Sequence, residues 1–283
     1  MKSLITEIFG FVTPITIALI VFAQGLRVAP NQVATCFKER PGLMLRSLIA
    51  ILVLVPAAAL VLILALNPAP GVAIGLAILV ASAPAPIMFK TAPGVGGGDA
   101  AFMESLHLSL AALAFVTVPA VLSLISIPLG FHADVDLGAM AWILARTILL
   151  PIGVAIAVRV FFPTFADRAA PILAKMANIG LVAVVAVVLA AFYHTLLDMD
   201  AWSYLVIAVV GAAALAIGHV SGPRDPHEKT INAIECAVRH PVLALTIAGA
   251  NFPRQEAVAV LLPCVLTIIA VALVYLIWRG RSR

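Results

Sequence analysis

Long apolar stretches separated by short polar segments run along the whole chain. They cover roughly residues 5–24, 43–66, 71–89, 100–128, 138–161, 171–193, 202–219, 230–250 and 256–278. An α-helix needs about 20 apolar residues to span a bilayer. The stretches are continuously apolar rather than alternating, which favours helices over the strands of a membrane barrel. The pattern predicts an all-α polytopic membrane protein with about nine transmembrane helices, forming a single transmembrane domain over residues 1–283.

Composition supports a membrane protein and excludes several other classes. Hydrophobic residues make up 64% of the chain and charged residues 11%, against about 45–50% and about 25% in soluble domains. Cys36, Cys236 and Cys264 lie far apart, so neither a metal site nor a disulfide framework is predicted. The N-terminal stretch contains Glu7 and has no small-residue cleavage site, so we expect a retained first helix. No cofactor and no nucleic-acid partner are expected.

Basic residues in the loops predict the orientation of the helices. If the N-terminus is outside, twelve Lys and Arg residues fall on one side of the membrane: Arg27, Lys38, Arg40, Arg46, Arg159, Arg168, Lys175, Arg224, Lys229, Arg279, Arg281 and Arg283. The other side has only Lys2 and Arg254. Cytoplasmic loops are enriched in Lys and Arg. We therefore expect a multi-pass protein, in the cell inner membrane if bacterial, with its N-terminus outside and its C-terminus in the cytoplasm.

Two of the apolar stretches are interrupted by proline. The third ends with Pro84 and Pro86, and the eighth contains Pro241. Proline removes a backbone donor and unwinds the preceding turn, which is tolerated at membrane depth only inside a protein or in a wet cavity. Each interrupted helix is third in its half of the chain, if the fifth helix is a spacer. This predicts inverted repeats over about 5–128 and 171–278, with a binding site at the breaks.

Four stretches together resemble the bile acid:sodium symporter family. They are FAQGLRVAPNQVATCFKERPGLML, SAPAP…GGDAAF, LLPIGVAIAVRV and HEKTINAIECAVRHPVLAL. The resemblance implies a core domain with two crossing broken helices, a panel domain, and alternating movement of an organic anion, usually with sodium. It places the anion near half-helix N-termini, whose dipoles favour negative charge. In this chain those ends are Pro84–Ile87, which includes Pro86, and His240–Val242.

The chain departs from the family where the resemblance places neutral ligands for sodium. The side chains found at these positions are Ile51, Phe89, Lys90, Met103, His107 and Arg239, while the family's glutamate is kept as Glu235. An unpaired charge at mid-bilayer costs about 2.5–3.5 kcal/mol. We therefore expect Lys90 or Arg239 to pair with Glu235 and offset its burial. Sodium dependence becomes doubtful, and sodium-independent transport is the prediction.

Proton coupling is the alternative to sodium that the residues suggest. His107 and His240 titrate near neutral pH when unperturbed, and Glu104 lies three residues before His107 on one helix face, which allows contact. Other roles stay open. Lys90 could snorkel to the interface, Glu104 could lie at a wet helix start, both histidines could make structural hydrogen bonds, and Arg239 could bind a substrate carboxylate.

The sequence thus predicts a secondary transporter of a small organic anion, embedded in the lipid bilayer. A cation/proton antiporter of related architecture is the alternative, because buried charges at broken helices also suit that chemistry. An intramembrane enzyme or sensor is a third reading, but no HExxH or GxSxG motif predicts an enzyme. The candidate site residues are Pro86, Ile87, Lys90, Glu104, His107, Glu235, Arg239 and His240.

Overall fold

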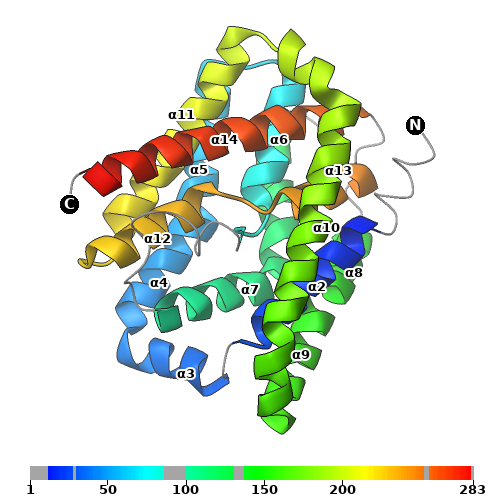
Figure 1. Ribbon diagram of the computed structural model, residues 1–283. Helices are drawn as coiled ribbons and strands as arrows, with labels where there is room; N and C mark the ends of the chain where they lie inside the picture. The colour runs from blue at the N-terminus through cyan, green and yellow to red at the C-terminus, as the bar shows by residue number, and fades with distance from the viewer. Residues whose placement is uncertain (1–11, 28–29, 86–99, 131–136, 252–254, 282–283) are drawn as a thin grey trace.

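The computed structural model describes residues 12–27, 30–85, 100–130, 137–251 and 255–281. In these ranges the chain is almost entirely helical and forms no strand apart from one isolated bridge. The helices are α2 (Thr13–Gly25), α3 (Pro30–Glu39), α4 (Pro41–Ile49), the π-helix η2 (Ala50–Leu54), α5 (Val55–Leu66), α6 (Pro70–Ala81), α7 (Ala100–Ser126), α8 (Leu137–Leu144), the π-helix η4 (Ala145–Leu149), α9 (Leu150–Phe161), α10 (Pro163–Asp198), α11 (Ala201–Ser221), α12 (Pro226–Ala237), α13 (Pro241–Asn251) and α14 (Gln255–Arg281) (Figure 1).

Several of these helices are long and apolar enough to cross a membrane. Within the described residues there are five: Pro41–Leu66, Phe102–Ser126, Pro163–Asp198, Ala201–Ser221 and Ala259–Arg281. The helical membrane class predicted from the sequence is confirmed. The total of about nine spanning helices and the inverted repeats stay predictions.

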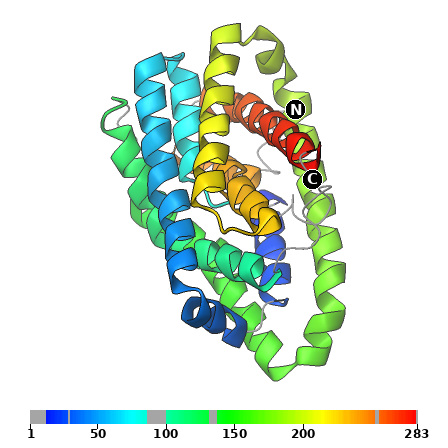
Figure 2. The same ribbon diagram turned by 90° about the vertical axis from the view of Figure 1, so that its left-hand side faces the viewer.

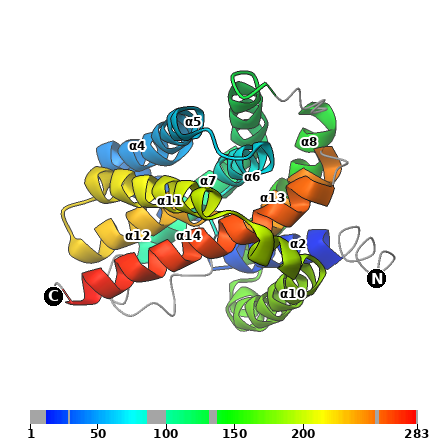
Figure 3. The same cartoon turned by 90° about the horizontal axis from the view of Figure 1, so that it is seen from above.

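The helices pack around one large and one small apolar cluster. The long α10 runs along one side of the molecule, with α2 and α9 packed against it (Figures 1 and 3). A small apolar cluster of Leu26, Ala155, Ala166 and Ala170 joins these three helices. The larger cluster extends through the rest of the molecule and also includes residues of α2, α9 and α10. Within it, α11 lies against both α12 and α14 (Figure 2). The α11–α12 contact is close because Gly218 has no side chain: a Cβ there would lie 2.6 Å from the Ala233 Cα.

Two prolines widen the helices that contain them. η2 precedes Pro56 and η4 precedes Pro151, each within the pattern Ala-x-x-x-Leu-x-Pro. The N–H of Val55 donates to the carbonyl of Ala50, five residues back, and Leu150 does the same to Ala145. Because proline has no N–H and its ring clashes with the carbonyl four residues back, the preceding turn widens to a π-turn. The apolar pattern predicted a continuous helix for both stretches and gave no indication of these turns.

Two chain breaks meet near the centre of the molecule. α6 ends at Ala81, and the backbone at Ser82 is extended. α12 ends at Ala237, and α13 begins at Pro241 after an extended link. The two extended segments pair in antiparallel fashion: the Ala85 N–H donates to the Val238 carbonyl at 3.0 Å and the His240 N–H to the Ala83 carbonyl at 2.8 Å. The break predicted in the eighth apolar stretch is therefore confirmed, and the chain that follows the first break lies outside the described residues.

Candidate functional site at the helix crossing

Arg239 lies in the second break and is buried, with 5% of its surface exposed. Its Nη1 donates to the Ser82 carbonyl and its Nη2 to the Ile51 carbonyl, both at 3.2 Å. The Ile51 carbonyl needs an outside donor because the Val55 N–H is taken by Ala50 and the next residue is proline. Ser82 stands where α6 gives way to extended chain. The guanidinium is thus a fixed cation that satisfies backbone groups freed by two helix irregularities.

Glu235 is fully buried on the last turn of α12, and its partner is His107 of α7. The His107 Nδ1 lies 3.2 Å from one carboxylate oxygen and 3.4 Å from the other. The expected pairing of Glu235 with Arg239 is therefore wrong. α12 ends between the two residues, so the extended chain directs Arg239 to α6 and η2 while Glu235 still faces α7. Lys90, the other expected partner, lies outside the described residues.

His240 caps the helix that follows the break. Its Nδ1 accepts the Leu243 N–H at 3.3 Å, in the manner of an N-cap side chain. An accepting Nδ1 carries no proton, so the neutral ring holds its proton on Nε2. That atom is buried and has no hydrogen-bond partner within the described part of the chain.

The remaining candidates are placed less fully. Glu104 lies one turn before His107 on α7 and is partly buried, but the hydrogen-bonded partner of His107 is Glu235 rather than Glu104. Pro86 and Ile87 fall outside the described residues. The crossing thus brings together four of the eight candidates: His107, Glu235, Arg239 and His240. Across the described residues, no group of three or more His, Cys, Asp or Glu side chains is placed to hold a metal ion.

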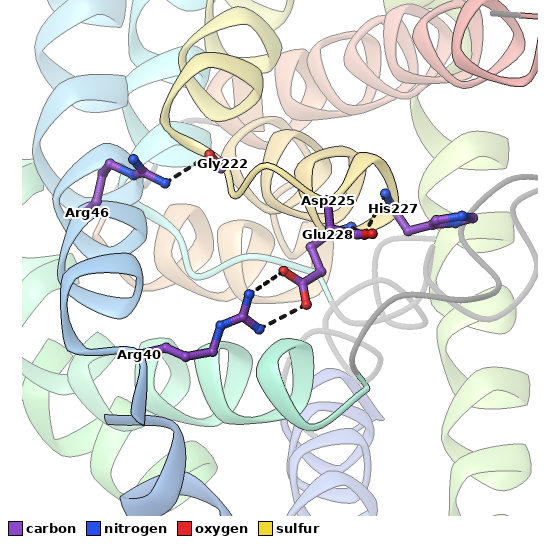
Figure 4. Close-up of polar contacts among 6 residues, drawn as sticks. All are labelled: Arg40, Arg46, Gly222, Asp225, His227 and Glu228. Carbon is purple, nitrogen blue, oxygen red and sulfur yellow. Dashed lines mark hydrogen bonds and ion pairs between the residues drawn. The ribbon is translucent and has the colours of Figure 1, made fainter. Parts of the chain in front are cut away.

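An ion pair and several hydrogen bonds hold the start of α12 in place (Figure 4). Arg40, at the corner between α3 and α4, binds both carboxylate oxygens of Glu228 at 2.9 and 2.7 Å. Arg46 of α4 donates to the Gly222 carbonyl at 2.9 Å. The Asp225 carboxylate accepts the backbone N–H of His227 and of Glu228 and so caps α12. These contacts fix the helix that carries Glu235 against α4.

A cavity of about 140 Å³ lies beside the crossing. Ala85, Val238 and Arg239 line it from the breaks, and α10 contributes a stripe of aliphatic side chains: Leu181, Val185 and Val188. Residues of α13 and α14 complete an almost wholly aliphatic wall. The α10 residues were not predicted from the sequence, because their i, i+4, i+7 spacing is also that of any buried or lipid-facing helix stripe.

Comparison with known proteins places the chain in a family. A sequence model described as the Sodium Bile acid symporter family matches residues 14–198. The match covers the first break and α10, and it ends before the second break with Glu235 and Arg239. No curated protein matches the chain. Members of the matched family are transporters rather than enzymes.

Proposed function

The chain belongs to the sodium bile acid symporter family, and from that premise we propose that it carries a small organic anion without sodium. The observation that supports this most directly is the buried Arg239 guanidinium, bonded to two carbonyls at the helix crossing. In this proposal the guanidinium supplies the positive charge that a sodium ion would otherwise bring to the site.

The surroundings of Arg239 disfavour a sodium ion. Sodium is a hard cation that needs several oxygen ligands, and the Ile51 and Met103 side chains offer none. The Ile51 and Ser82 carbonyls already accept from the guanidinium. A sodium ion about 4 Å from that charge would be repelled by about 4 kcal/mol at an effective dielectric constant of about 20. Such a penalty weakens binding about a thousandfold.

The cavity beside the crossing suggests the type of cargo. Its aliphatic wall suits an apolar body, and the buried Arg239 guanidinium beside it supplies a fixed positive charge that favours a carboxylate or sulfonate. We therefore propose an anion with a compact aliphatic body.

The proposal keeps the single transmembrane domain with inverted repeats over about 5–128 and 171–278. The pairing of the two helix breaks supports this architecture.

The proposed orientation keeps the N-terminus outside and the C-terminus in the cytoplasm. Several basic residues predicted to be cytoplasmic meet around the α11–α12 connection, which supports one common side for them. Arg40 and Arg46 reach it from α4, and Arg279 reaches it from α14 by donating to the Pro226 carbonyl at 2.9 Å.

Uptake into proteoliposomes tests the proposal. A thermal-shift screen of short carboxylates and sulfonates supplies the probe, and its uptake is measured with sodium and with choline in its place. We expect equal uptake in both media. Arg239→Gln should abolish uptake, whereas Arg146→Gln, which changes an exposed arginine of η4, should not. Strong, saturable stimulation by sodium would refute the proposal.

The buried His107–Glu235 pair is the observation that favours the second candidate, a cation/proton antiporter. An antiporter would dissipate a preset pH gradient when sodium or potassium is added without any organic anion. The anion transporter proposed here should leave that gradient intact until the carboxylate or sulfonate is added.

A further inference from the structure

We propose that the His107–Glu235 pair binds one proton for each anion carried, so that transport is electroneutral proton symport. The inference rests on the proposed function and names its coupling ion. It starts from the fact that Glu235 is fully buried while its hydrogen-bond partner is an imidazole rather than a fixed cation. Such a pair can hold a proton on either partner, because a carboxylate accepts from an Nδ1–H and a carboxylic acid donates to a bare Nδ1.

Charge balance at the crossing links that proton to the anion. Arg239 contributes a permanent positive charge. When the pair holds one proton, the pair is neutral, and a bound anion cancels the charge of Arg239. When the proton has left, ionised Glu235 cancels Arg239 and the site is neutral without an anion. The loaded and the empty site are both neutral only if proton and anion bind together.

Two mismatched forms remain, the site with the proton but no anion and the site with the anion but no proton. Both carry a net charge through the membrane interior. By insertion scales, one uncompensated charge at mid-bilayer lowers the population of the charged site at that depth on the order of a hundredfold. The site would therefore cross either with both ligands or with neither. This is the condition for coupled transport, and it follows from one fixed and one titratable charge in the same buried place.

The neighbouring titratable groups do not take over this role. His240 uses its Nδ1 to cap α13, so a second proton on the ring would cost that hydrogen bond. Cys236, next to Glu235 on α12, is fully buried. Glu104 lies on α7 one turn from His107 and is partly buried. Among the residues that the structure describes, the fixed charge at the same crossing is that of Arg239. Because His107 keeps 12% of its side chain exposed and Glu235 none, His107 is the entry point for the proton.

The first test needs no substrate. Infrared difference spectra of the full chain in lipid nanodiscs are recorded between about pH 5 and about pH 8, the range in which histidine titrates. We expect carboxyl and imidazole bands that change with pH and that both Glu235→Gln and His107→Gln remove. Glu228→Gln is the matched control on the same helix, and it should leave these bands unchanged because Glu228 is paired with Arg40. Bands that survive Glu235→Gln would overturn the proposal.

The second test separates coupling from folding. In Glu235→Gln the site is neutral with an anion and charged without one, so the loaded form should cross and the empty form should not. Exchange of labelled for unlabelled anion should therefore persist, while net uptake driven by a pH gradient should fall on the order of a hundredfold. A variant that is merely misfolded would lose both. Wild-type uptake should respond to the pH gradient and not to a potassium-diffusion potential.

The failures of the two proposals are distinguishable. If no carboxylate or sulfonate is exchanged by the wild type, the proposed function fails, while the infrared result still decides whether the pair binds a proton. If exchange occurs without sodium but wild-type net uptake ignores the pH gradient, or if exchange and net uptake both persist in Glu235→Gln, the anion transporter stands and the proton site is refuted.

Discussion

The ion pair between Arg40 and Glu228 should respond unequally to the loss of its two partners. The Glu228 side chain is 6% exposed, whereas that of Arg40 is 35% exposed. In Arg40→Gln the carboxylate remains buried without its bidentate partner, which costs about 3 kcal/mol, at the lower end of the range for broken buried pairs. In Glu228→Gln the guanidinium turns to water, and the loss is about 1 kcal/mol.

The double substitution sharpens this prediction. Arg40 also lies over the Phe102 ring at 5.4 Å from its centroid, a contact worth about 0.5–1 kcal/mol. The variant with both substitutions loses the pair and this contact but strands no carboxylate, so its cost should be about 2 kcal/mol. Adding Glu228→Gln to Arg40→Gln should therefore raise the stability rather than lower it further.

Thermal unfolding in detergent measures the effect. Cys36, Cys236 and Cys264 are buried free thiols, so a thiol-reactive dye reports unfolding. With about 2 °C per kcal/mol for a chain of this size, we expect the Tm to fall by about 6 °C in Arg40→Gln and by about 2 °C in Glu228→Gln. The reasoning is refuted if Arg40→Gln costs no more than Glu228→Gln, or if the double variant is the least stable of the three.

Two further variants test local geometry. Gly218→Ala should lower the Tm by roughly 2–6 °C, as overpacking by about 1–3 kcal/mol does, because the new Cβ would lie 2.6 Å from the Ala233 Cα. The control is Gly153→Ala, whose Cβ meets nothing within 4 Å and which should be neutral or slightly stabilising in the same dye assay. Equal losses of Tm in the two variants would contradict the close packing at Gly218. Asp200 caps α11 by accepting both the N–H and the hydroxyl of Ser203, and these bonds, the hydroxyl above all, hold the pKa of its carboxyl below the usual value. The stabilisation by the Asp200 cap is therefore complete above the unfolded pKa of about 3.9 and is lost as the pH falls through the lower folded value. The Tm advantage of the wild type over Asp200→Ala should therefore shrink in acid. A Tm advantage that does not change with pH would count against the cap.

Local rules account for most of the secondary structure. Continuous apolar runs gave helices, and the breaks follow from prolines, since Pro84 and Pro241 each stand where a helix has stopped or restarted. The π-turns before Pro56 and Pro151 obey the same local chemistry. A proline alone does not identify such a turn, because Pro119 and Pro263 lie inside the α-helices α7 and α14.

Long-range register was not within reach of one sequence. Nothing near Glu235 in the chain indicates that it meets His107, 128 residues away. The charge of Arg239 suggested the nearest carboxylate as its partner, whereas the geometry gave it two carbonyls from segments far earlier in the chain. The sequence could not show which side chains of α10 line the cavity, because periodicity identifies a helix face but not the neighbour that this face contacts.

The bridge between the two breaks has a consequence for how this architecture can diversify. Two of the hydrogen bonds that join the breaks connect backbone groups, from Ala85 to Val238 and from His240 to Ala83. Substitutions at these positions that preserve the extended backbone leave the bridge intact. Ligands at the crossing can therefore be exchanged during evolution, such as an arginine for a metal-binding amide, while the backbone bridge that holds them is retained. Divergence in ion dependence would then require few mutations, and sequence kinship alone would be a poor guide to it.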